Sequence, residues 1–172
     1  PTPYLWSQDD IGRLLDAARA LRSPIRAATH QALFGLLAVS GMRVGEATGL
    51  DRGDIDFETG VVTIRHAKHD RTRLVPLHET AIAALDTYAT ERDRLCPATR
   101  SDAFFVSNTG TRLTPSGIAK TLRQITTDMG IRDATTAPTA HQLRHSFAVR
   151  TLMDWQQSGV SIDGKIAILS TY

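Results

Sequence analysis

The sequence has one cysteine, Cys96, and no apolar run that approaches the ~20 residues needed to cross a membrane. A single cysteine cannot form an internal disulfide or a cysteine-based metal centre. No basic segment followed by an apolar one marks the chain for export. These absences exclude a membrane protein, a disulfide scaffold and a zinc finger. They predict a soluble, cytoplasmic protein that has no membrane partner.

Lysine is also scarce, because only three of the twenty basic residues are lysines and the other seventeen are arginines. The planar guanidinium of arginine binds phosphate through two parallel hydrogen bonds, so this bias suits a nucleic-acid partner. A GC-rich genome would produce the same bias. Composition alone therefore leaves the partner open.

The length of 172 residues, with 41% hydrophobic and 22% charged residues, fits one globular domain. The first residue, Pro1, is not an initiator methionine. At the other end a helical pattern is still running at the last residue, in the apolar positions Ile162, Ile166, Leu169 and Tyr172. We therefore expect residues 1–172 to be a single domain cut from a longer protein.

Apolar residues recur at helical spacing over most of the chain. The first predicted helix begins with a capping box at Ser7 and ends at Ser23-Pro24, and the second covers residues 25–40 and ends at Gly41. The later ones are a short helix over about 43–49, a helix through Ile82, Leu85 and Ala89, a helix from Thr114-Pro115 to Gly130, and a helix from about Ala140 that packs Leu143, Phe147, Thr151 and Trp155 inward.

Two runs have the composition of strands, at residues 61–65 and 73–77, and a polar hairpin loop is predicted between them at 66–72. Residues 54–56 could supply a further strand. The prediction is an α+β domain, mostly helical, with a small antiparallel sheet of about three strands.

The first motif that could carry chemistry is Ser-Gly-Met-Arg-Val-Gly-Glu at residues 40–46. The glycine turn places Arg43 at the start of a new helix, where its charge adds to the positive end of the helix dipole and favours an anion. Glu46 lies three residues further on, where it can orient Arg43. Ordinary surface Arg–Glu pairs have the same spacing, so this motif alone leaves its role open.

The second motif is Lys68 at the tip of the predicted hairpin, with His66, His69, Arg71 and Arg73 around it. A lysine there can reach over a phosphate, and it can deliver a proton when neighbouring cations depress its pKa. The alternative is a solvated charged turn.

The third motif contains His141, Arg144 and His145, which share one face of the last predicted helix. A histidine that moves protons and an arginine that neutralises charge suit phosphoryl chemistry. One alternative is a metal bound by the two histidines, but no glutamate follows the first histidine as the metalloprotease motif requires. Another is a pair of capping or core histidines. We expect no metal and no cofactor.

In this order and at about these separations, the three motifs resemble the catalytic domain of the tyrosine recombinase (phage integrase) family. The resemblance covers essentially the whole chain. It implies cleavage of double-stranded DNA by a tyrosine that attacks the scissile phosphate, leaving a phosphotyrosyl bond and a free 5′-hydroxyl. Attack by another strand's hydroxyl then reverses the step, without metal or ATP. Members of the family work as tetramers on DNA.

The resemblance also implies roles for individual residues. Arg43 and Arg144 would hold the non-bridging phosphate oxygens, and Lys68 would be the general acid for the leaving 5′-oxygen. His141 would handle a proton, Glu46 would orient Arg43, and His145 would support the site.

Two parts of the family pattern are missing from the sequence. One is the N-terminal DNA-clamping domain, and the other is a Leu-Gly-His (or Trp) segment followed by the nucleophilic tyrosine. Tyr172 extends an apolar stripe and has no such segment before it, so we expect no nucleophile in this chain, and Tyr4 and Tyr88 fit less well. One alternative is a non-catalytic DNA-binding protein. Another is a topoisomerase IB-like enzyme, and the sequence around Arg43 and His141 disfavours this second alternative.

Overall fold

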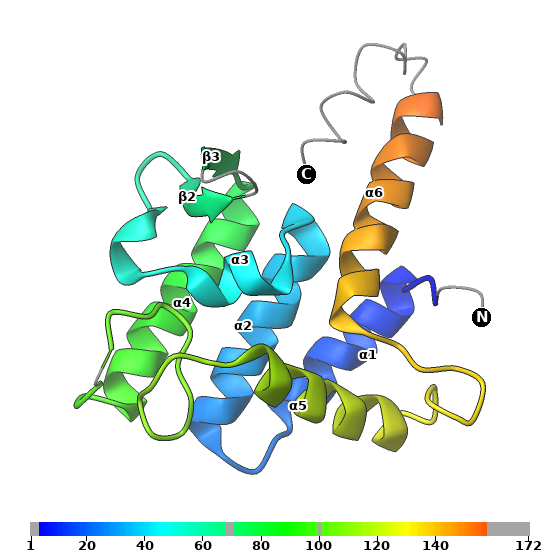
Figure 1. Ribbon diagram of the computed structural model, residues 1–172, viewed down its shortest axis with the longest axis horizontal. Coiled ribbons are helices and arrows are strands. Elements are labelled where there is room, and N and C mark those ends of the chain that lie inside the picture. The colour runs from blue at the N-terminus through cyan, green and yellow to red at the C-terminus, as the bar shows by residue number, and fades with distance from the viewer. Residues whose placement is uncertain (1–3, 68–70, 100, 158–172) are drawn as a thin grey trace.

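A central helix organises the computed structural model, which describes residues 4–67, 71–99 and 101–157. This helix, α2 (Pro24–Ser40), contacts α1 (Gln8–Arg19), α4 (Glu79–Leu95) and α6 (Ala140–Gln157), as Figure 1 shows. The shorter helices are α3 (Val44–Gly49), α5 (Pro115–Asp128) and the 3-10 turn η1 (Arg52–Asp54). Most apolar residues of α2 are buried against these neighbours, among them Leu33, Phe34 and Leu37, whereas Val39 is exposed.

The sheet consists of β1 (Ile55–Asp56), β2 (Val61–Ala67) and β3 (Arg71–Pro76), in that order and antiparallel. Ile55 lies opposite Val62, and Val62 lies opposite Val75, so one face of the sheet is apolar and buried. The predicted α+β class with about three strands is confirmed.

The predicted hairpin loop at 66–72 was too long. The strands continue to Ala67 and resume at Arg71, and these two residues pair with each other. Polar side chains suggest a loop, but a strand with one exposed face carries them as well. Residues 68–70, which include Lys68 and His69, lie outside the described part of the chain, as do the side chains at 66, 67, 71, 155 and 156.

The boundary between the first two helices also differs from the prediction. The capping box at Ser7 is present, with its hydroxyl accepting from the backbone N–H of Asp10 at 3.0 Å. The helix ends at Arg19, before Ser23-Pro24, and those two residues begin α2 instead. Proline fits the first position of a helix because the N–H it lacks would have no partner there.

The segment around Trp6 is fixed to the first turns of α6. Trp6 is buried, its backbone N–H donates to the Ser146 hydroxyl at 2.8 Å, and its indole donates to the Thr139 carbonyl at 3.4 Å. In α6, Leu143 is fully buried and Phe147 is partly buried, as predicted, whereas the Trp155 side chain lies outside the description.

No helix within the described ranges is both long enough and apolar enough to span a membrane. The helical stripe predicted from Ile162 to Tyr172 lies outside those ranges.

Candidate active site

The site is built around the turn that ends α2. Gly41 has a φ of 62°, in the left-handed region that glycine adopts without steric cost. A Cβ atom at this position would lie 2.6 Å from Cδ1 of Phe147, so the close approach of α6 also requires a glycine. The turn places Arg43 at the N-cap of α3, where its side chain is 44% exposed.

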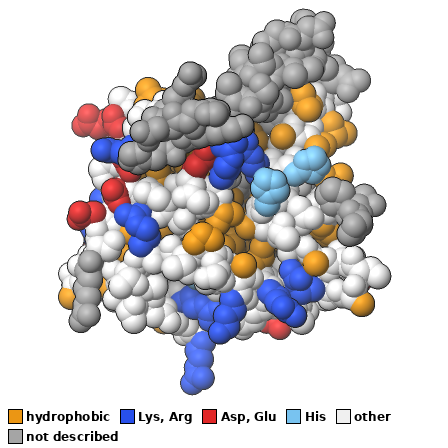
Figure 2. Space-filling model, in the orientation of Figure 1, with side chains coloured by type: hydrophobic (Ala, Val, Ile, Leu, Met, Phe, Trp, Pro, Cys, Tyr) orange, Lys and Arg blue, Asp and Glu red, His pale blue; other side chains and the backbone are white. Residues whose placement is uncertain are grey.

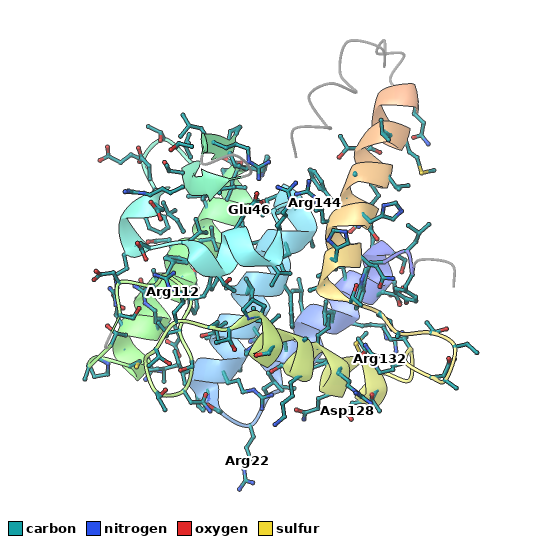
Figure 3. All side chains as sticks on the ribbon, viewed as in Figure 1. Arg22, Glu46, Arg112, Asp128, Arg132 and Arg144 are labelled. Atoms are coloured by element: carbon teal, nitrogen blue, oxygen red, sulfur yellow. The ribbon has the colours of Figure 1, made fainter. Side chains whose placement is uncertain are left out.

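Helix α6 reaches the same turn from the other side. Nη1 of Arg144 donates a hydrogen bond to the Gly41 carbonyl oxygen at 2.6 Å, and the side chain is half-buried. Figure 3 shows Arg144 of α6 facing Glu46 of α3 across the turn. The first and third motifs, about a hundred residues apart in sequence, therefore meet in space.

Glu46 connects the charged groups of the site. Its Oε2 accepts from the backbone N–H of Arg43 at 2.8 Å, and its Oε1 accepts from Nη1 of Arg43, also at 2.8 Å. Its Oε2 accepts in addition from Nη2 of Arg73 at 2.9 Å. Only 8% of the Glu46 side chain is exposed, and a carboxylate buried to this degree needs such partners. The ion pair expected between Arg43 and Glu46 is present.

The arginines influence one another electrostatically. Burial and the nearby Arg43 guanidinium lower the pKa of Arg144, while Glu46 raises it and Arg73 lowers it again. Among the described residues, two guanidiniums thus contact the Glu46 carboxylate and a third, that of Arg144, is close enough to feel its charge. The excess of positive charge, in a partly buried position where screening is weak, favours the binding of an anion.

His141 and His145 lie on α6 on either side of Arg144, and both are exposed. Figure 2 shows histidine side chains beside a group of Lys and Arg side chains on this face of the molecule. The structure therefore brings Arg43, Glu46 and Arg144 together and places the two histidines on the helix that carries Arg144. Lys68 remains a prediction, because it lies outside the described residues.

Two of the three tyrosines can be placed, and both are engaged elsewhere. Tyr88 is buried in the core, where its hydroxyl lies 3.1 Å from Oγ1 of Thr29 and donates to the Phe104 carbonyl at 3.2 Å. The hydroxyl of Tyr4 donates to the carboxylate of Asp10 at 2.8 Å. Tyr172 lies outside the described part of the chain.

The described residues contain no group of three or more His, Cys, Asp or Glu side chains that could hold a metal ion. Among the described residues, the charged groups that meet at the Gly41 turn are the guanidiniums of Arg43, Arg73 and Arg144 and the carboxylate of Glu46, a set that suits an anion.

Sequence reasoning noted Arg73 only as a neighbour of Lys68 and missed its contact with Glu46. The strand alternation contains a signal for it. Arg73 and Val75 are two residues apart and so share one face of β3; Val75 is buried and Leu74, between them, is exposed. An arginine on the inward face of a strand needs acceptors for its hydrogen bonds, and the alternation does not specify which residue supplies them.

Comparison with known proteins agrees with this architecture. A model of the phage integrase family matches residues 6–160. A Sinorhizobium fredii protein, y4rB, is 40% identical over 178 residues, and the match covers 99% of this chain and 57% of that protein. The chain thus spans little more than half the length of this relative.

Two solved structures are similar in fold and sequence. The XerA recombinase superposes with a TM-score of 0.72 at 32% identity, over 90% of this chain and 52% of that one. The XerH site-specific recombinase, bound to its difH substrate in a pre-cleavage complex, gives a TM-score of 0.67 at 28% identity, over 91% of this chain and 44% of that one. These matches confirm the resemblance seen in the three motifs: the chain belongs to the phage integrase family.

Proposed function

We propose that this chain is the catalytic domain of a site-specific DNA recombinase, which cuts and rejoins double-stranded DNA. The observation that carries the proposal is the meeting of Arg43 and Arg144 at the Gly41 turn, with positive charge in excess. A pair of fixed guanidiniums is suited to a phosphodiester. The similarity to XerH, whose structure contains its DNA substrate, supports the same assignment.

In the proposed reaction, a tyrosine hydroxyl attacks phosphorus in line with the 5′-oxygen. The tyrosine O–P bond forms as the P–O5′ bond breaks, and negative charge is shared by the non-bridging oxygens. Arg43 and Arg144 stabilise that charge, and Lys68 gives a proton to the leaving 5′-oxygen. His141 handles the proton of the attacking hydroxyl, Glu46 holds Arg43 in place, and His145 supports the site.

The two guanidiniums supply the electrostatic stabilisation at the phosphate, so the proposed reaction uses no metal and no other cofactor. The energy of the broken P–O5′ bond is retained in the phosphotyrosyl bond. Attack by a 5′-hydroxyl on that bond returns the tyrosine and completes strand exchange, so ATP is not required.

We propose further that the attacking tyrosine is not Tyr4, Tyr88 or Tyr172. Tyr88 is buried and Tyr4 is bonded to Asp10, and both observations support this part of the proposal. The nucleophile and a DNA-clamping domain would come from other parts of a longer protein, because the chain matches 57% of its relative. The working form would be a tetramer on DNA in the cytoplasm.

The test is strand cleavage by the full-length protein carrying Arg144→Ala, on a nicked substrate whose site has been selected by binding from a random pool. We expect the rate of covalent adduct formation to fall by about 10²–10³-fold, with DNA affinity largely kept. The matched control is Arg150→Ala. Arg150 lies on the same helix and is half-buried, but it donates to the Ala38 carbonyl at 3.1 Å, in the last turn of α2, and not to the Gly41 carbonyl.

Full cleavage by the Arg144→Ala protein would contradict the role given to Arg144. DNA binding by the unsubstituted full-length protein with no covalent adduct would instead support a non-catalytic DNA-binding protein.

A further inference from the structure

Arg73 has no role in the proposed reaction, yet it contacts Glu46 inside the site. It projects from β3 and reaches Oε2 of Glu46 with its Nη2, at 2.9 Å, while Oε1 of the same carboxylate holds Nη1 of Arg43 at 2.8 Å. Arg73 and Arg43 come from different elements, a strand and the N-terminus of a helix. One carboxylate therefore connects the sheet to the phosphate-binding arginine.

The degree of burial separates the two arginines. The side chain of Arg73 is 17% exposed, against 44% for Arg43. Removing a guanidinium from water is costly unless its partners compensate, and Glu46 is such a partner. Arg43 is the more exposed of the two arginines, and Arg73 contacts the carboxylate that holds Arg43 from the inner side.

Rotation of the Glu46 carboxylate would release Arg43. Held only at Oε1 by the Arg43 guanidinium, the carboxylate could turn about its terminal bond, since that torsion is broad. Two donors on Oε2 oppose this rotation, the backbone N–H of Arg43 at 2.8 Å and Nη2 of Arg73 at 2.9 Å. Of the two, only Arg73 comes from another element, so it ties the carboxylate to the sheet.

We propose that Arg73 is a positioning residue for Arg43, acting through Glu46. By holding Oε2, it keeps Oε1 directed at the Arg43 guanidinium, which is then already oriented when the DNA phosphate arrives. The expected effect of Arg73 on cleavage rests on the proposed function. Its expected effect on DNA binding does not, because binding can be measured without strand cleavage. Preorganisation of this kind lowers the cost of ordering a side chain on binding.

The first test is a double-mutant cycle in the full-length protein with Arg73→Ala, Glu46→Gln and the pair together, measured as cleavage rate at saturating DNA. Each single substitution should slow cleavage by about tenfold to a hundredfold, the equivalent of a hydrogen bond to a charged group. The pair should be no slower than Glu46→Gln alone, because Arg73 acts through Glu46. If the fold-decrease in the double variant equals the product of the two single fold-decreases, the proposal is overturned.

The second test uses this chain and the affinity for a short DNA duplex as a function of salt, so it needs no cleavage. Arg43→Ala should lower the slope of log affinity against log salt by about 0.9, because one phosphate contact is lost. Arg73→Ala should weaken binding about three- to tenfold with an unchanged slope, and should have no effect in the Arg43→Ala background. The proposal would be overturned if Arg73→Ala reduced the slope, if it weakened binding in the Arg43→Ala background as well, or if it had no effect on affinity.

Two controls separate positioning from general damage to the sheet. Arg65 on β2 makes a similar ion pair with the buried carboxylate of Asp54, at 2.6 Å, rather than with Glu46, so Arg65→Ala should leave the slope and the cleavage rate unchanged. Arg73→Lys keeps the charge with a simpler donor and should recover part of the lost rate. Thermal unfolding of every variant verifies that it is folded.

A full-length protein that cleaves no DNA would refute the proposed function and leave the binding test to decide the role of Arg73. If the unsubstituted protein cleaves DNA and the rate losses of Arg73→Ala and Glu46→Gln multiply in the double variant, only the role proposed for Arg73 is refuted.

Discussion

Gly41 has no side chain to offer a substrate, yet three features of the candidate site depend on it. Its positive φ ends α2 and starts the chain toward Arg43, its missing Cβ admits Phe147, and its carbonyl accepts the hydrogen bond from Arg144. The relative position of the two arginines is therefore determined at one residue. Glu46 has a comparable role for orientation, because three donors converge on its carboxylate.

Gly41→Ala should lower the free energy of unfolding by about 2–5 kcal/mol, the sum of a left-handed alanine and an overpacked contact with Phe147. Urea unfolding of this chain measures it. Gly45→Ala is the control, since Gly45 is exposed in α3 with nothing within 4 Å of the added methyl group; it should be neutral or stabilising by up to about 1 kcal/mol. Equal losses at the two positions would contradict this explanation.

Tyr4 gives a prediction for alkaline pH. Burial, the hydrogen bond to Asp10 and the charge of Asp10 raise the pKa of Tyr4 from 10.0 to about 12. The folded state then keeps a proton that the unfolded chain loses, so the contribution of Tyr4 to stability is complete below pH 10 and is lost as the pH rises toward 12. Urea unfolding at a series of pH values should show this decline, and Tyr4→Phe should make it shallower. An unchanged decline in Tyr4→Phe would show that other groups cause it.

At the scale of elements, α6 matters most, because it carries His141, Arg144 and His145. Its first turns are held by the N-terminal segment, through the contacts of Trp6 with Ser146 and Thr139. Further along, Arg150 donates to the Ala38 carbonyl of α2. The helix is thus fixed at several points along the part that faces the Gly41 turn.

Trp6→Ala should destabilise the chain by about 3–5 kcal/mol, because a large buried ring and the hydrogen bond from its indole to the Thr139 carbonyl are lost. The adjacent Leu5 is an exposed residue, so Leu5→Ala should change the unfolding free energy by less than about 0.5 kcal/mol. Hydrogen exchange should locate the loss from Trp6→Ala in the first turns of α6. A loss confined to α1 would contradict the anchoring role.

At the scale of the whole molecule, the sequence patterns predicted what depends on local spacing. Helical periodicity identified the central helix, strand-type composition identified the sheet, and three-residue spacing identified the Arg43–Glu46 pair. Contacts between distant elements were beyond such patterns. The packing of Phe147 on Gly41 and the contact of Arg73 with Glu46 join segments that are far apart in the chain, and nothing in either local sequence specifies the partner. The misplaced end of the first helix has another cause, because Ser-Pro is both a stop signal and a start signal.

In the proposed site, arginines from two distant parts of the chain hold one phosphate. A crystal structure of this chain with a DNA duplex selected for binding would show which phosphate each arginine contacts. We predict guanidinium nitrogens of Arg43 and Arg144 within hydrogen-bonding distance of non-bridging oxygens of the same phosphate, with Glu46 still bonded to Arg43. A complex in which the two arginines contact different phosphates, or in which the DNA lies on another face of the molecule, would contradict it.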